Sequence, residues 1–191
     1  MLMDETMHDP VSSLVFTGHM VDLPDRKEPR FPQASVPAAR AAIREKILKA
    51  MAPDQSPPIG IASGARGGDI LFHEECRALG LRTIIVLPFP PEEFERVSVS
   101  GVPGTDWVKR FRRLWRETTQ EDREVMGLPR KDEAYSTCNT RIIERAREHG
   151  RFHLIALWDG KGGDGLGGTA DLIKQAETQS GKADIIAPGK L

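Results

Sequence analysis

The sequence predicts a single doubly wound α/β domain, with a mostly parallel sheet of about five strands and a charged helical insert. Three observations support this. Five short runs rich in Ile, Val and Leu lack the polar alternation of a half-exposed strand, which suits strands buried on both faces. Helical stretches separate the runs, as in a parallel sheet covered on both sides. Glycine and polar residues follow three of the runs, where such sheets bind ligands.

The predicted strands, in chain order, are residues 13–17, 59–63, 82–87, 152–158 and 183–187. The predicted helices are residues 38–51, 68–79, 105–119, 137–149 and 169–178. Each helix repeats apolar residues at the three- or four-residue spacing of one buried face, and Gly80 and Gly150 suit helix ends. We therefore expect one domain over residues 13–187, between an N-terminal extension of residues 1–12 and a tail of residues 188–191.

Composition limits the possible partners. The 191 residues include 27 basic and 28 acidic side chains, and a net charge of −1 gives no strong nonspecific attraction to nucleic acid or anionic membranes. No apolar run approaches the ~20 residues that span a bilayer, and the first residues lack an apolar signal core. The two cysteines, Cys76 and Cys138, have no metal-binding spacing. We expect a cytoplasmic protein without a metal or a required cofactor.

A glycine turn joins the second predicted strand to the helix after it. Glycine permits positive φ and close approach of the backbone to a ligand, and a helix start offers free N–H groups to phosphate. An arginine between the glycines adds further donors. The expected ligand contacts are Gly64, Arg66, Gly67, Gly68 and Asp69. The alternative interpretation is a tight turn in which Asp69 caps the helix or faces its dipole.

A second glycine-rich segment follows the fourth predicted strand and has six glycines in eleven residues. Thr169 can cap the helix that begins there and turn its hydroxyl toward a ligand. The expected ligand contacts are Asp159, Gly160, Gly167, Gly168 and Thr169. The alternative is a flexible loop before a capped helix. Neither glycine segment matches the Walker or the GxGxxG pattern, which disfavours kinase-type and ordinary dinucleotide sites.

Four other polar or glycine positions lie near expected strand ends. Gly18 and His19 follow the first strand, where His19 with Asp22 suits a ribose better than a metal ion. Asn139 and Arg141 open the helix before the fourth strand, and capping of that helix is the alternative to ligand contact.

We expect the two glycine turns to share one pocket, because the carboxyl ends of parallel strands meet at one edge.

The charged insert combines five basic residues with Phe111 and Trp115 over residues 109–116. Basic and aromatic residues together can bind nucleic acid. The four-residue spacing of the two aromatics favours burial instead, and nearby acidic residues dilute the positive charge. Nucleic acid is therefore the less favoured partner.

The two glycine segments resemble a known superfamily. Gly64-Ala65-Arg66-Gly67-Gly68-Asp69 resembles the Gly-Ala-Arg-Gly-x-Asp signature of the SLOG superfamily, which includes LOG phosphoribohydrolases, the DNA-processing protein DprA and nucleotide sensors. Gly167-Gly168-Thr169-Ala170-Asp171 resembles its second signature, and Asn139 is similarly placed to an Asn of sensor-like members. The resemblance implies a Rossmann-like fold, a nucleotide-derived ligand between the two turns, and frequent self-association into homo-oligomers.

One departure from that pattern bears on catalysis. LOG hydrolases carry Pro-Gly-Gly-x-Gly-Thr-x-x-Glu with a catalytic Glu, whereas this chain has Leu172 at the Glu position and Asp164 at the Pro position. Asp171 is one residue early and points about 100° away around the helix. The resemblance therefore favours a signalling-type nucleotide sensor over an enzyme. Two alternatives stay open: a nucleotide hydrolase that cleaves an N-glycosidic or phosphoester bond, with Asp69, Asp159 or Asp171 as its acid-base group, and a DprA-like DNA-binding protein.

Overall fold

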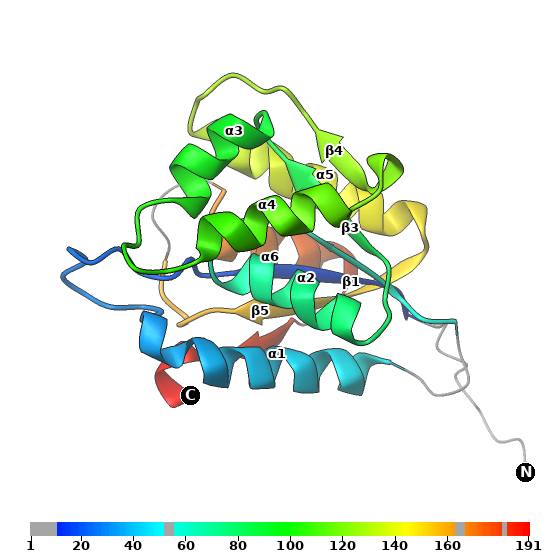
Figure 1. The fold of residues 1–191 in the computed structure, drawn as a ribbon. Coiled ribbons are helices and arrows are strands. Elements are labelled where there is room, and N and C mark those ends of the chain that lie inside the picture. Colours follow the sequence, from blue (N-terminus) through cyan, green and yellow to red (C-terminus); the bar gives the residue numbers. More distant parts are fainter. Residues whose placement is uncertain (1–10, 52–55, 163–166, 181–182) are drawn as a thin grey trace, which may run out of the picture.

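The computed structural model describes residues 11–51, 56–162, 167–180 and 183–191 (Figure 1). Nearly all of the expected N-terminal extension lies outside these residues. A single parallel sheet has the strand order β4-β3-β2-β1-β5-β6, which confirms the predicted fold class. Its strands are β1 Val11–Gly18, β2 Ile59–Ala62, β3 Thr83–Leu87, β4 Arg123–Val125, β5 Arg151–Leu157 and β6 Asp184–Ile186.

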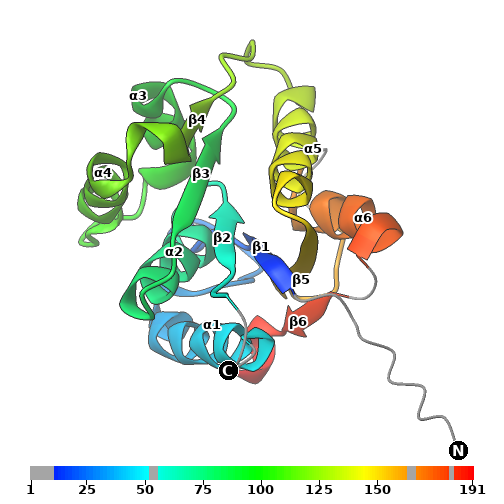
Figure 2. The same cartoon turned by 90° about the vertical axis from the view of Figure 1, so that its right-hand side faces the viewer.

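Two layers of helices enclose the sheet (Figure 2). The helices α1, α2 and α4 cover one face, and α5 and α6 cover the other. The helices are α1 Val36–Ala50, α2 Gly68–Ala78, α3 Pro91–Phe94, α4 Trp107–Glu117, α5 Glu133–Glu148 and α6 Thr169–Ser180. A π-helical turn, Glu95–Val99, follows α3, and short 3₁₀ turns occupy Gln33–Ser35, Gln120–Asp122 and Pro188–Lys190.

The strands divide their side chains between two hydrophobic cores. Along β1, Leu14 and Phe16 pack toward α1 and α2, whereas Val15 packs toward α5. This alternation is the two-residue period of a strand. Every residue of β3 is buried, as the uninterrupted apolar run predicts. Burial on both faces thus explains why these runs show no polar alternation.

The order of the strands places a crevice beside β1. The chain adds β2, β3 and β4 on one side of β1, then returns through α5 to β5 on the other side. The loops that follow β1 and β5 therefore diverge toward opposite faces of the sheet. In doubly wound sheets this switch point leaves an opening at the carboxyl ends of the strands, where ligands bind.

The expected charged insert is an integral part of one helical layer. Trp107, Phe111 and Leu114 of α4 are buried, and α4 packs on α2. Arg110 donates to both carboxylate oxygens of Glu74 on α2 at 2.8 and 2.6 Å. The segment after α4 then adds β4 to the edge of the sheet by pairing with β3. Helix α5 begins at Glu133, four residues before its predicted start.

Within the described residues, the structure contains no helix that is both long and apolar enough to cross a bilayer.

Replacing Phe111 by alanine tests whether α4 belongs to the core. The ring is 2% exposed and packs beside Phe94 and Trp115. Its removal leaves a cavity, so we expect the free energy of unfolding to fall by about 3–5 kcal/mol. Urea denaturation followed by circular dichroism measures the change. Lys109→Ala on the exposed side of α4 is the control and should have little effect. A near-neutral Phe111→Ala would show that α4 is peripheral.

Candidate functional site

A cavity of about 550 Å³ opens at the carboxyl edge of the sheet. Loops after β1, β2 and β3 form one side, and the start of α5 with the turn before α6 forms the other. Both glycine turns contribute to this single cavity. The first gives Ala65, Arg66 and Asp69, and the second gives Gly167, Gly168 and Thr169. The expectation that the two turns share a pocket is therefore met in the geometry.

The first glycine turn also packs directly against the loop after β1. Gly67 has φ +97°, and a Cβ there would lie 2.7 Å from the backbone nitrogen of Val21. The N–H of Gly68 donates to the carbonyl of His19 at 3.3 Å. Gly64 faces the ring of Phe111 instead. These three glycines were expected to contact the ligand, but they do not line the cavity, because neighbouring protein atoms occupy the space beside them.

The side chain of Arg66 forms hydrogen bonds with two neighbouring loops. Its side chain is 5% exposed, and Nε donates to the carbonyl of Val21 at 2.9 Å. Nη1 donates to the carbonyl of Ser100 at 3.2 Å. Burial lowers the pKa of the guanidinium. Arg66 therefore joins the loop after β2 to the loops after β1 and β3, while its contact with an anion stays a prediction.

Asp69 is a buried carboxyl group in the wall of the cavity. It lies in the first turn of α2 and is 7% exposed. Its Oδ2 accepts a hydrogen bond from the N–H of Ala65 at 3.1 Å. Burial raises the pKa of Asp69 to about 7, and the hydrogen bond from Ala65 opposes this only in part. A carboxyl group of this kind can give or take a proton at neutral pH.

Asn139 ties the second glycine turn to α5. Its Nδ2 donates to the carbonyl of Gly167 at 3.1 Å and to Oδ2 of Asp171 at 2.9 Å. Gln175 donates to the same carboxylate oxygen at 2.9 Å. Asp171 is thus held between α5 and α6 and does not line the cavity, whereas Leu172 does. This agrees with the expected direction of Asp171 around the helix.

Thr169 places a hydroxyl group at the start of α6. The residue is 9% exposed and lines the cavity, next to Gly168. No hydrogen bond joins its hydroxyl to another described residue. The first N–H groups of a helix have no partner within the helix. The start of α6 therefore combines a hydroxyl donor with backbone donors on the cavity wall.

His19 and Asp159 meet at the rim of the cavity, between the loops after β1 and β5. Nε2 of His19 lies 3.0 Å from Oδ1 of Asp159 and 3.2 Å from the backbone nitrogen of Asp159. Burial lowers the pKa of His19 despite the neighbouring carboxylate. His19 and Gly18 line the cavity as expected, while Asp159 holds His19 from outside its lining.

A closed loop over residues 22–31 covers the cavity beside this pair. The N–H of Asp22 donates to the carbonyl of Phe31 at 2.9 Å, and Oδ2 of Asp22 accepts from the N–H of Phe31 at 2.8 Å. Arg30 of this loop donates to the carbonyl of Gly162 at 2.9 Å. In the sequence this stretch is polar and rich in proline, and no motif in it indicates a binding role. Sequence reasoning missed this loop and also missed lining residues whose types carry no signal of their own, namely Met20, Leu23, Phe94, Val97, Ser98 and Tyr135.

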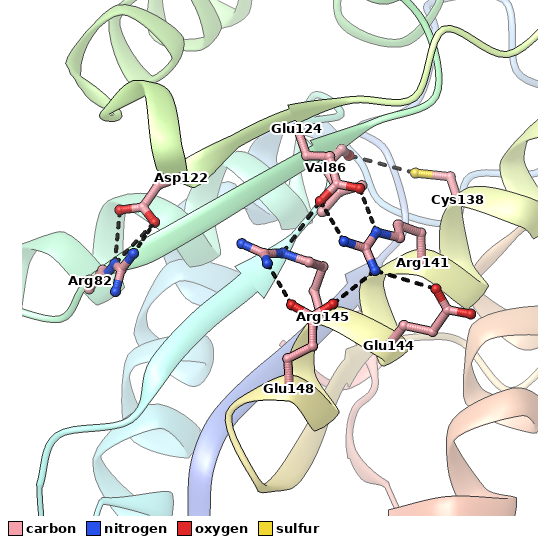
Figure 3. Close-up of polar contacts among 9 residues, drawn as sticks. All are labelled: Arg82, Val86, Asp122, Glu124, Cys138, Arg141, Glu144, Arg145 and Glu148. Carbon is pink, nitrogen blue, oxygen red and sulfur yellow. Dashed lines mark hydrogen bonds and ion pairs between the residues drawn. The ribbon is translucent and has the colours of Figure 1, made fainter.

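Arg141 does not line the cavity, and its guanidinium instead joins an ion-pair network (Figure 3). Its Nη2 donates to Glu124 of β4 at 3.1 Å, and Nη1 donates to Glu148 of α5 at 3.0 Å. Glu124 raises the pKa of Arg141 above its ordinary value. The expected ligand contact by Arg141 is therefore corrected to an ion-pair network between β4 and α5. Gly160, with φ +80°, also lies outside the lining, and residues 163–166 of the glycine-rich segment lie outside the described residues.

A metal site and a nucleic-acid surface are the two other kinds of site to compare with the described part of the chain. It holds no group of three or more His, Cys, Asp or Glu side chains placed to bind a metal ion. Three of the five basic side chains of α4 are paired with carboxylates: Arg110 with Glu74, Arg112 with Glu95 and Arg113 with Glu117. These pairs reduce the positive field that a phosphate backbone requires.

Comparison with known proteins gives a distant structural likeness. No family model and no curated protein sequence matches this chain. Among solved structures, the X-ray structure of DNA processing protein A (DprA) from Streptococcus pneumoniae matches with a TM-score of 0.41 and 12% identity. The match covers 94% of this chain but only 60% of that DprA chain. A likeness at this level carries no ligand or activity over to this chain.

Removing the Arg66 side chain should destabilise the fold. Arg66→Ala leaves the carbonyls of Val21 and Ser100 without their donor, so we expect the free energy of unfolding to fall by about 2–4 kcal/mol. Chemical denaturation measures the loss. Arg112→Ala is the control, since Arg112 is exposed and pairs with the Glu95 carboxylate at the surface. If both variants unfold at the parent midpoint, Arg66 does not fasten the loops.

Gly167 and Gly160 allow a matched test of the second turn. Both have positive φ, but a Cβ on Gly167 would lie 2.3 Å from Cβ of Tyr135, whereas one on Gly160 meets no atom of the described residues within 4 Å. Gly160→Ala should cost about 1–2 kcal/mol of stability from backbone strain alone. Gly167→Ala should cost clearly more, because α5 and the turn must separate. Equal melting temperatures for the two variants would contradict the close packing of the turn on α5.

Proposed function

We propose that this protein binds a nucleotide or nucleotide-derived small molecule in the cavity between its two glycine turns, as a sensing or binding module. The observation that carries the proposal is the start of α6, where Thr169, whose hydroxyl has no hydrogen-bond partner among the described residues, lines the cavity beside Gly168. Hydroxyl and backbone donors at a helix start suit a phosphate group. The rest of the ligand then lies against the remainder of the lining.

The composition and size of the cavity support such a ligand. Aromatic and aliphatic side chains make up much of the lining and suit the flat face of a base. They are Phe16, Val21, Leu23, Phe94, Val97, Tyr135, Ile142, Trp158 and Leu172. A volume of about 550 Å³ lies within the usual range for small-molecule sites, about 300–1,000 Å³. An apolar interior with a few placed polar groups is the common composition of such sites.

A ligand screen tests the proposal. The panel contains the four ribonucleoside 5′-monophosphates, ADP, ATP, NAD, inorganic phosphate and a single-stranded oligonucleotide. A ligand at one hundred times its Kd stabilises the folded state by about 2.7 kcal/mol, which a thermal-shift measurement detects. We expect at least one mononucleotide to bind, with calorimetry giving its Kd. Binding of the oligonucleotide alone, weakened by salt, would favour the DNA-binding alternative.

Thr169→Val should weaken the binding of that mononucleotide about tenfold, because a hydrogen bond to a charged phosphate contributes about 1.5–3 kcal/mol. The variant keeps the shape of the side chain and removes the hydroxyl. Thr140→Val is the matched control, since Thr140 is an exposed threonine on α5 that pairs with Gln175. Unchanged affinity in Thr169→Val would remove the start of α6 from the binding site.

A second candidate function, nucleotide hydrolysis, is favoured by Asp69 alone. Its buried carboxyl group has a pKa of about 7 and lines the cavity, as a general acid or base requires. Leu172 speaks against it, because an aliphatic side chain at that position moves no proton. Chromatography of the same nucleotide mixtures detects released base or phosphate. Release at ~1 s⁻¹ or faster, abolished in Asp69→Asn, would make the enzyme the better interpretation.

A further inference from the structure

We propose that Asp69 is a specificity-determining residue that sets the orientation of the bound nucleotide. Its carboxylate keeps a second phosphate away from the α2 end of the cavity, so that the only anionic group of the ligand lies at the start of α6. The site would therefore select nucleotides with their phosphate at one end, such as 5′-monophosphates, over 3′,5′-bisphosphates. This inference rests on the proposed function.

Two helix starts reach the cavity, but they differ in charge. At α2 the carboxyl group of Asp69 already occupies the turn, where its Oδ2 accepts from the N–H of Ala65 at 3.1 Å. At α6 the nearby carboxylate, Asp171, is held by Asn139 and Gln175 and does not line the cavity. Thr169 instead lines the cavity, and its hydroxyl has no partner among the described residues. An anion therefore meets donors at α6 and a carboxyl group at α2.

No described cation pairs with Asp69. Arg66, its neighbour in the same turn, directs Nε and Nη1 to the carbonyls of Val21 and Ser100. A second anion brought beside the ionised carboxylate in this desolvated space is repelled strongly. Burial places the pKa of Asp69 at about 7, so the repulsion should weaken as the pH falls through neutrality. The other titratable or charged groups that line the cavity are His19, Asp22, Asp25, Arg26, Arg30, Arg66, Tyr135 and Cys138.

The carboxyl group also suits the neutral part of a nucleotide. An ionised carboxylate accepts hydrogen bonds from sugar hydroxyls or from an exocyclic amino group, and a protonated one both donates and accepts. Only one oxygen of Asp69 is used by Ala65. With the phosphate at α6, the sugar and base extend toward Asp69 and the apolar lining. The arrangement thus gives the two ends of the cavity different chemical preferences.

Calorimetric titration at pH 8 tests the inference with two probes, the ribonucleoside 5′-monophosphate that binds best in the screen and its 3′,5′-bisphosphate. We expect the wild-type protein to bind the monophosphate at least about tenfold more tightly. In Asp69→Asn the affinity for the bisphosphate should rise by most of this tenfold factor. Asp106→Asn changes the net charge equally at an exposed side chain and should leave the ratio unchanged. Lowering the pH to 6 should bring the Kd values of the two probes closer together in the wild type but not in Asp69→Asn. The variant serves as the reference, because the ligands and His19 titrate in both proteins.

The outcomes separate this inference from the proposed function. If the wild type binds both probes equally at pH 8 while Thr169→Val still weakens them, the nucleotide site stands and the role of Asp69 is overturned. If no nucleotide binds at any pH, the proposed function and this inference both fail. If Asp69→Asn does not fold, Asp69→Ser takes its place in the same titrations: a pH dependence of the ratio that is equal in this variant and in the wild type contradicts the role of Asp69.

Discussion

The two hydrogen bonds of the buried Arg66 guanidinium hold one wall of the cavity together. They join the turn after β2 to carbonyls in the loops after β1 and β3, three segments that the sheet alone leaves unconnected beyond the strand ends. Gly67 lets two of these segments touch, because any Cβ there would strike the backbone of Val21. The hydrogen bonds of Arg66 and the close approach at Gly67 thus fix the same turn against its neighbours. Asp69 lies just after these two residues, in the first turn of α2, so its position depends on both contacts.

The opposite wall has a different origin. It belongs to the helical layer of α5 and α6, where Asn139 joins the glycine turn and the start of α6 to α5. The contact of His19 with Asp159 connects the two walls at the rim. Each wall is therefore anchored to its own face of the sheet, and the cavity lies where the chain changes sides. The topology alone creates the opening, whereas a small number of polar side chains gives it its shape and charge.

The sequence revealed most of the fold, because strands buried on both faces are recognisable as apolar runs. Strand β4 was missed because Arg123, Glu124 and Val125 form a short edge strand with no such run. That omission hid the partner of Arg141, which is Glu124 on the unseen strand. The glycine turns were placed correctly, but their spacing could not show which glycines face protein and which face the cavity. That distinction depends on loops distant in sequence, such as the one around Val21 and the helix around Tyr135.

The sheet below the cavity has long paired strands at its centre and short strands at its edges. Strands β1 and β5 pair over the whole length of β1, from Val11 opposite Arg151 to Gly18 opposite Leu157, whereas the edge strands β4 and β6 have three residues each. Amide hydrogens at the centre of the sheet should therefore exchange with solvent last, and those at its edges and in the loops first. A ligand in the cavity would add little protection to its floor. Slowed exchange should appear in the loops above it, so that occupancy could be followed there amide by amide.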